Sequence, residues 1–414
     1  MTPLPSLCLV ADGMNSYLAV SPLGTTFEDG SYTSRKLEVN WYGGEALPSD
    51  EIVVGVGGEP MERHSPADHE WNYLFSEISY PLEGGEGCEG HHASYLRGTG
   101  VLATGCVRAR TEWMRESWDC IGDVPLRRVV LPGAHDAGAY DVYQGEASEN
   151  LVTKYAVTQD ESLGAQLFYG IRYLDIRVSY SASDEHVFWM VHGLVRMHPL
   201  IEGVRDVRAF LDATTHEIVI FDLHGFEAGF DREDRSDEAH RALIDFLIGE
   251  FGDHLAPRAM GEDVTAGQLV AAGRRLLLTY NDDRFLWDDL LWPGVDHQWG
   301  DVQSAEDLFE YLSGVHEDPT GHGGFWSGMA ELTPTLEDIL QDRFGGLRNM
   351  ADMVNRNVTM WYRDLWAART NIVAVDFFMG TDIVDVAVRA NLLFQCGGST
   401  GGLNNELTDE LTIH

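Results

Sequence analysis

Apolar positions follow two patterns along the chain, and the first covers residues 1 to about 110. In the stretch 36–42, Leu37, Val39 and Trp41 alternate with polar residues, a period of two that predicts a half-buried strand. Further strands are predicted at 51–56, 93–96 and 101–107, with glycine pairs between them. Short strands joined by Gly-rich turns are typical of a small β-sandwich.

From residue 126 onward, apolar runs alternate with helical patterns. The runs predict strands at 129–131, 171–178, 187–191, 218–223, 276–280, 325–332 and 372–377. The first strand should end at Pro132-Gly133, which cannot continue a ladder. Two helix faces are predicted, one by Val204, Val207, Phe210 and Leu211 and one by Leu243, Phe246, Leu247 and Phe251. Repeated βα units favour a TIM-type barrel, with an open doubly wound sheet as the alternative.

The predicted fold class is therefore α/β, with a β-rich N-terminal domain (1–110) before a barrel domain (126–395). Residues 111–125, which include Trp113, Trp118 and Cys120, are expected to form an amphipathic linker. The stretch 397–402 is rich in glycine but has no lysine and no preceding strand. We therefore expect 396–414 to be a flexible acidic tail rather than a phosphate-binding loop.

The sequence carries 67 acidic and 28 basic residues, which gives a net charge of −39. Nucleic acid is not an expected partner, because its binding needs clustered Lys and Arg. A surface this acidic suits a salty medium, where charge repulsion is screened. Lysine is nearly absent, with only Lys36 and Lys154, and a genome that prefers Arg to Lys explains this without salt adaptation. No apolar run is long enough to cross a membrane, and the N-terminus lacks the basic start of a signal peptide.

The cysteines do not form a metal-binding pattern. They are Cys8, Cys88, Cys106, Cys120 and Cys396, without a CxxC pair. Cys88 and Cys106 could pair in an exported protein, and otherwise buried free thiols are expected. His91 and His92 are expected in a surface loop, since no further ligand stands at a usual spacing.

Polar residues stand where the predicted barrel strands end. In chain order they are His135 and Asp136, Asp175 and Arg177, His192, Asp222 and His224, and Asp376. Each has a structural alternative: Asp175 and Arg177 could form a buried ion pair, and Asp376 could cap a helix. Chemistry in barrels gathers at the C-terminal ends of strands. Histidines, an arginine and carboxylates there favour acid–base cleavage of a phosphodiester.

Several segments together resemble the phosphatidylinositol-specific phospholipase C X-domain family. They are 131–138 (LPGAHDAG), 170–177 (GIRYLDIR), 192–193 (HG), 218–224 (IVIFDLH) and 371–377 (NIVAVDF). The resemblance is closest to the small eukaryotic X-domain-containing proteins and more distant to the bacterial enzymes. It spans roughly residues 115–395 and implies an irregular TIM barrel.

The resemblance also implies catalytic roles. His135 would be the base that deprotonates the inositol 2-hydroxyl, and His192 the acid that protonates the departing diacylglycerol oxygen. Arg177 would stabilise the charge that develops on the phosphate. Asp376 would fix the tautomer of His135. Of the other catalytic candidates, Asp136 would support the arginine and the second histidine, and Asp175 would belong to the same network.

Calcium-dependent mammalian relatives carry a carboxylate where this chain has Arg177. A guanidinium supplies positive charge directly and repels a cation, so we expect no cofactor. A weak binding site for a divalent cation at Asp136, Asp175 and Asp222 remains an alternative. Asp136 and Asp222 occupy positions that match calcium ligands of the mammalian branch. The substrate-binding candidates are Asp222, His224, Tyr280 and Trp299, and Trp292 either lines the mouth or packs in the barrel.

The expected function is a phosphoric diester hydrolase or lyase that cleaves phosphatidylinositol-like phospholipids through a cyclic inositol phosphate. The alternatives are a non-catalytic lipid- or protein-binding barrel and a metal-dependent glycerophosphodiester or sphingomyelin phosphodiesterase. The expected partner is phospholipid at a membrane interface, contacted through apolar rather than basic side chains. We expect a soluble monomer, cytoplasmic or secreted, with peripheral membrane contact.

Overall fold

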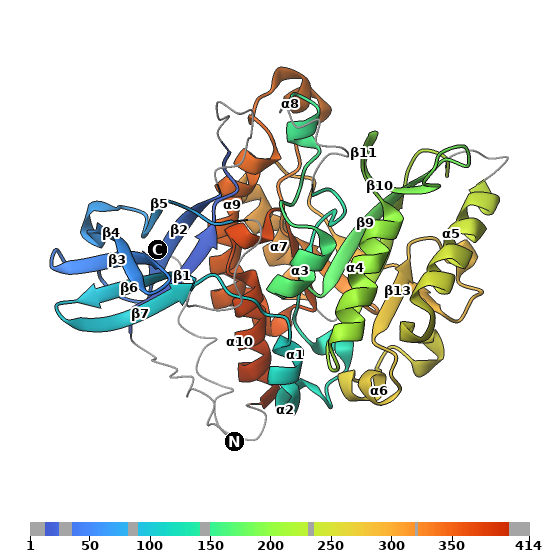
Figure 1. Ribbon diagram of the computed structural model, residues 1–414, viewed down its shortest axis with the longest axis horizontal. Coiled ribbons are helices and arrows are strands. Elements are labelled where there is room, and N and C mark those ends of the chain that lie inside the picture. The colour runs from blue at the N-terminus through green and yellow to red at the C-terminus, as the bar shows by residue number, and fades with distance from the viewer. Residues whose placement is uncertain are drawn as a thin grey trace. The chain divides into compact units, whose positions relative to one another are not determined.

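The computed structural model describes residues 13–24, 35–81, 90–140, 150–230, 236–318 and 322–396. The chain divides into two compact units (Figure 1). The smaller runs up to Ala109 and also takes in Met379–Asp382, and the larger contains the rest of the chain from Arg110 onward. The predicted tail beyond Cys396, together with Cys8 and Cys88, lies outside the described residues.

Where the structure describes the smaller unit, it contains two antiparallel sheets. One has the order β1 (Asn15–Val20), β2 (Lys36–Tyr42), β5 (Tyr73–Ser79). The other has the order β4 (Glu59–His64), β3 (Asp50–Val56), β6 (His91–Arg97), β7 (Gly100–Cys106). The sheets meet where Gly105 lies against Tyr17, since a Cβ on Gly105 would come within 2.7 Å of the Tyr17 backbone. These sheets confirm the β-rich fold expected for this part of the chain.

Two details of the smaller unit correct the predictions. Strand β2 is buried on both faces, because Glu38 and Asn40 are covered as well as Leu37 and Val39. The Asn40 side-chain amide donates to Glu38 at 2.8 Å, so the two buried polar groups satisfy each other. His91 and His92 lie in β6 rather than in a surface loop.

Among the described residues, eight parallel strands form the core of the larger unit. In sequence order they are β8 (Leu131–Ala134), β9 (Tyr173–Tyr180), β12 (Val219–Phe226), β13 (Leu276–Tyr280), β14 (Leu291–Pro293), β15 (Asp296–Gln298), β16 (Trp326–Met329) and β17 (Ile372–Val375). Their order in the curled sheet is β14-β13-β12-β9-β8-β17-β16-β15. The irregular barrel is confirmed, and among the described residues its ladder is interrupted between β14 and β15.

The first barrel strand includes Pro132 and Gly133, where we expected it to stop. Gly133 is needed for the close approach of β9, because a Cβ there would meet the Tyr173 ring at 2.7 Å. Tyr173 is itself fully buried in the barrel core with Leu131, Ile220 and Trp292. Trp292 is therefore a packing residue and does not line the mouth.

Helices cover the outside of the barrel, with α3, α4 and α5 along one side (Figure 1). The helices are α1 (Trp113–Glu116), α2 (Trp118–Ile121), α3 (Leu163–Tyr169), α4 (Leu200–Ala213), α5 (Ser236–Phe251), α6 (Ala266–Ala271), α7 (Ala305–Glu317), α8 (Leu336–Gln341), α9 (Leu347–Trp361) and α10 (Ile383–Cys396). The predicted face of α4 is buried, and that of α5 is buried except for the half-buried Phe246. None of the described helices combines the length and apolarity needed to span a bilayer.

Two further predictions for the larger unit were wrong. The run 187–191 is not a parallel barrel strand: β10 (Phe188–His192) forms an antiparallel hairpin with β11 (Val195–Pro199) and pairs antiparallel with β9. The physical reason is length, because β9 ends at Tyr180, and a parallel connection needs a dozen or more residues. Residues 111–125 are not a linker, since they contain α1 and α2 and belong to the larger unit.

Cys120 and Cys396 form a disulfide instead of remaining free thiols. Their Cα atoms are 4.7 Å apart, although 276 positions separate them in the sequence. The pairing follows from the packing of α10 against α2, which the sequence spacing does not show. The bond ties the last described helix to the first turns of the larger unit.

Candidate active site

A pocket of about 460 Å³ lies among the strand ends of the larger unit. The predicted residues His135, Arg177, His192 and Asp376 all line it, although they lie in or directly after four different strands. The parallel register of β17, β8 and β9 brings three of these strand ends side by side. The structure therefore gathers in one cavity the residues that the sequence places at separate strand ends.

His135 is bonded on both ring nitrogens. Its Nδ1 lies 2.7 Å from Asp376 Oδ1, and the Arg177 guanidinium donates to its Nε2 at 2.7 Å. A carboxylate accepts the proton of Nδ1, and a guanidinium N–H needs a lone pair on Nε2. These contacts orient the ring with Nδ1 toward Asp376 and Nε2 toward Arg177 and the pocket.

The backbone directly after His135 and after Asp376 is left-handed. Asp136 has φ 35° and Phe377 has φ 46°, a conformation that L-residues rarely adopt. Hydrogen bonds hold both turns: the Asp136 amide donates to Asp175 Oδ2 at 3.0 Å, and the Phe377 amide donates to a backbone carbonyl at 2.7 Å. Such strain persists where surrounding contacts fix it, and here it orients the histidine and its carboxylate partner.

Asp175 and Arg177 point to the same face of β9, as their spacing predicts. Arg177 Nη2 lies 3.3 Å from Asp175 Oδ2, and Arg177 Nε lies 3.7 Å from Asp136 Oδ2. Burial alone would raise the pKa of Asp175, but the Arg177 charge holds it well below its usual range. The guanidinium is thus a permanent positive charge between two buried carboxylates.

His192 lies near Asp136 on the hairpin strand β10. Its Nδ1 donates to the Ala156 carbonyl at 2.8 Å and lies 3.8 Å from Asp136 Oδ2. Burial and the Arg177 charge lower the pKa of His192 to about 4. Near pH 7 the ring is therefore neutral in nearly all molecules, and only a small fraction carries the second proton that a general acid needs.

The pKa of His135 moves in the opposite direction. Burial by itself would lower it, but the neighbouring Glu331 and Asp376 carboxylates raise it to about 9. Burial also raises the pKa of Asp136 to about 7, and neither of its carboxylate oxygens has a hydrogen-bond partner among the described residues. The two imidazoles thus differ strongly in basicity although they share one pocket.

Glu331 is a site residue that the sequence did not reveal. It follows β16, its Oε1 lies 4.0 Å from His135 Nε2, and burial raises its pKa to about 7. Within the described chain, neither of its carboxylate oxygens has a hydrogen-bond partner. Its position at a strand end is the usable signal, but the predicted strand 325–332 ran past it.

The substrate-binding candidates divide into two groups. His224 and Trp299 line the pocket, and Trp299 also donates from Nε1 to Thr333 at 2.8 Å. Asp222 is fully buried and accepts a 2.5 Å hydrogen bond from Thr279. Tyr280 is wrong as a substrate contact, because it is fully buried with its hydroxyl 2.5 Å from His240 Nδ1.

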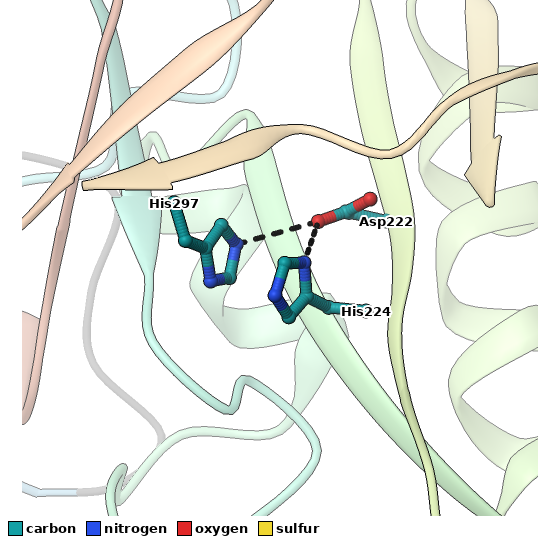
Figure 2. Close-up of side chains that lie close together, drawn as sticks. All are labelled: Asp222, His224 and His297. Atoms are coloured by element: carbon teal, nitrogen blue, oxygen red, sulfur yellow. Dashed lines mark hydrogen bonds and ion pairs between the residues drawn. The ribbon is translucent and has the colours of Figure 1, made fainter. Parts of the chain in front are cut away.

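The structure separates two sets of candidate metal ligands. The set Asp136, Asp175 and Asp222 does not fit a cation well, because Arg177 lies beside the first two carboxylates. A different group is clustered: Asp222, His224 and His297 present ligand atoms within 4.8 Å of one another (Figure 2). The sequence did not single out His297, since β15 is only 3 residues long and shows no periodicity.

Comparisons with known proteins agree with the resemblance in sequence. No protein-family model matches the chain. It is 28% identical over 302 residues to PI-PLC X domain-containing protein 2 of Mus musculus, covering 67% of this chain and 85% of that protein. It is 27% identical over 311 residues to PI-PLC X domain-containing protein 1 of Homo sapiens, covering 69% of this chain and 94% of that protein.

Solved structures agree in fold. A phosphatidylinositol-specific phospholipase C of Staphylococcus aureus superposes with a TM-score of 0.52 at 17% identity, over 68% of this chain and 98% of that one. The enzyme of Listeria monocytogenes gives a TM-score of 0.50 at 19% identity, with the same coverage. The chain is therefore similar in sequence to the PI-PLC X domain-containing proteins and shares the barrel fold of the bacterial phosphatidylinositol-specific phospholipases C.

Proposed function

We propose that this protein is a phosphodiesterase that cleaves phosphatidylinositol-like phospholipids by acid–base catalysis with two histidines, without a metal. The observation that carries the proposal is the His135 ring, held between Asp376 and Arg177 in a pocket that His192 also lines. The similarity to the X-domain proteins supports the substrate class.

The first step begins when a substrate phosphate binds Arg177. A guanidinium binds phosphate oxygens well, so it would turn from His135 Nε2 to the phosphate. The freed Nε2 then accepts the proton of the inositol 2-hydroxyl, whose oxygen attacks the neighbouring phosphorus. Arg177 stabilises the charge that develops on the phosphate, where it is worth more than in water.

The leaving group needs the second histidine. A protonated His192 would deliver its proton to the departing diacylglycerol oxygen as the phosphorus–oxygen bond breaks, and the product is a cyclic phosphodiester. Its Nδ1 is committed to the Ala156 carbonyl, so Nε2 is the ring atom that serves the substrate. If water then opens the cyclic product, the two histidines exchange roles, as microscopic reversibility requires.

Exposed apolar residues near the pocket suit contact with a lipid surface. Leu194 follows His192 by two positions and is 94% exposed, while Leu336 and Leu340 on α8 are 72% and 68% exposed. The segments β11 and α8 lie toward the same end of the larger unit (Figure 1). With a net charge of −39, apolar insertion rather than charge attraction would hold the protein at the interface.

The test of the proposed function is turnover of vesicles of phosphatidylinositol, phosphatidylcholine or sphingomyelin in excess EDTA. We expect cleavage of phosphatidylinositol alone, because only its head group places a hydroxyl beside the phosphate. Strict dependence on calcium or magnesium would refute the metal-independent mechanism and favour a metal-dependent phosphodiesterase. Vesicle binding without turnover of any lipid would favour the non-catalytic lipid binder.

The pKa values predict the pH profile of phosphatidylinositol cleavage. The reactive form has neutral His135 and protonated His192. Its population is the fraction of neutral His135 multiplied by the fraction of protonated His192, and this product is constant between the two pKa values. A plot of kcat/KM should therefore be flat from about pH 4 to about pH 9, the values for His192 and His135. Replacing Asp376 with Asn removes a charge that raises the pKa of His135, so the alkaline edge should move to lower pH.

The measurement is kcat/KM against pH on a short-chain phosphatidylinositol, for wild type and Asp376→Asn. The matched control is Asp253→Asn, which removes a fully exposed carboxylate and should leave the edge in place. An unmoved edge in Asp376→Asn would contradict the assignment of His135 to the alkaline limb.

A further inference from the structure

We propose that Asp222, His224 and His297 form a binding site for a divalent transition-metal ion of the zinc class. The three side chains come from β12 and β15, and both imidazoles present a nitrogen to the same carboxylate oxygen (Figure 2). The inference does not rest on the proposed function, because catalysis there is assigned to other residues and metal binding is measured without lipid.

The distances between the three side chains match the spacing of ligands in a metal site. Asp222 Oδ2 lies 3.2 Å from His224 Nδ1 and 3.4 Å from His297 Nε2. Charge-assisted N–H···O bonds are shorter, about 2.7–2.9 Å. Ligand atoms about 2.0–2.1 Å from a tetrahedral zinc ion stand roughly 3.3–3.4 Å apart, which is the spacing found here.

The two imidazole rings are also unusually close. Their centroids are 3.3 Å apart and their planes differ by 2°, whereas aromatic pairs prefer offset or edge-on contacts at about 4.5–7 Å. An ion bound by both rings would attract them toward each other. A cation shared by His224 and His297 would supply that attraction, with the rings tilting apart so that both lone pairs meet the ion.

Hydrogen bonds from buried groups orient the Asp222 carboxylate, as hydrogen bonds to the ligands do in known metal sites. Thr279 donates to Asp222 Oδ1 at 2.5 Å, and the Tyr173 hydroxyl lies 2.8 Å from Oδ2. The same hydroxyl lies 2.6 Å from His297 Nε2, a contact that a bound ion would replace while Tyr173 keeps its bond to Asp222. Such supporting hydrogen bonds fix ligand orientation and raise metal affinity.

The ligand types select the metal. Two imidazoles and one carboxylate suit zinc and its neighbours, whereas calcium and magnesium prefer sites made of oxygen ligands. Three protein ligands leave one tetrahedral position open, and His224 and His297 line the same pocket as Arg177. The open position can therefore take an anionic oxygen of a ligand that enters the pocket.

The test uses the full chain without an affinity tag, first stripped of metal and then titrated with Co²⁺ as a spectroscopic probe and with Zn²⁺ by calorimetry. We expect one ion per chain, the intense visible absorption of tetrahedral Co²⁺, displacement by Zn²⁺ and no displacement by Ca²⁺. His224→Gln and His297→Gln should each weaken binding by at least ~10-fold. The matched control is His254→Gln, which removes an imidazole that pairs with the single carboxylate of Asp212 at 2.9 Å.

Circular dichroism of each variant checks folding. If His297→Gln does not fold, the result for His224→Gln is used alone, because the His224 side chain is 22% exposed and its loss should disturb the fold less. Absence of stoichiometric binding to the wild type would overturn the proposal. So would wild-type affinity in both histidine variants, or a weak octahedral Co²⁺ spectrum that Ca²⁺ abolishes. Tetrahedral binding of one Co²⁺ per wild-type chain, weakened in the histidine variants, would support the proposed metal site. This result does not depend on whether the protein cleaves phosphatidylinositol.

Discussion

Replacing His135 with alanine is expected to lower kcat on phosphatidylinositol by about 10²–10⁴-fold, the usual contribution of a positioned acid or base. The variant removes the ring that lies between Asp376 and Arg177, so no nitrogen is left to accept the hydroxyl proton. Arg177 keeps its contact with Asp175, and phosphate binding should therefore survive. The measurement is kcat and KM on phosphatidylinositol vesicles, with KM expected to change far less than kcat.

His254→Ala is the matched control for His135→Ala. His254 also pairs with an aspartate, but it precedes Leu255, which pairs with Leu276 at the start of β13, the end of the strand opposite to the pocket. Its loss should leave kcat unchanged. Turnover of His135→Ala at the wild-type rate, with the fold intact by circular dichroism, would refute His135 as the base.

Replacing Glu217 with glutamine is expected to destabilise the larger unit by about 3–5 kcal/mol, the cost of leaving a buried charge without its partner. Both Glu217 and Arg172 are fully buried, and their charged groups are joined by contacts of 2.6 and 2.9 Å. Glu217 also accepts hydrogen bonds from the backbone amides of Met114 and Arg115 at the start of α1. The substitution therefore weakens both the charge pair and the attachment of α1 to the barrel.

The measurement is the free energy of unfolding from urea titration, read at the transition in which the barrel unfolds. Glu112→Gln removes one negative charge from the exposed pair with Arg115 and serves as the control. Exposed pairs contribute at most about 1 kcal/mol, so this variant should differ little from wild type. Equal stability losses in the two variants would contradict the importance of the buried pair.

The parts of the site that were predictable lie at the ends of long apolar strands. The segment before His135, the Asp175–Arg177 pair and the run before Asp376 each combine a buried strand with charged residues at its end. Parallel strands bring such ends to one edge of a barrel. The fold class was therefore enough to predict that these residues lie close together. The role of Asp376 as the partner of His135 came from the family resemblance, and the structure places the two 2.7 Å apart.

The parts that were missed depend on contacts distant in sequence or on very short elements. His297 lies on a strand of 3 residues, which carries no periodicity. Glu331 was hidden because an apolar run continues past the end of β16. The Cys120–Cys396 bond depends on helix packing, and Tyr280 was misread because side-chain direction at the end of β13 is not encoded by spacing.

The central claim is that two histidines and an arginine cleave a phosphodiester by internal attack of a neighbouring hydroxyl. The most direct test is the phosphorus NMR spectrum of the products formed from phosphatidylinositol by the full chain in excess EDTA. The proposed mechanism predicts that the resonance of a 1,2-cyclic inositol phosphate appears first, before any open monoester, and that it is absent with His135→Ala. Direct formation of the open monoester, or of phosphatidic acid, would contradict it.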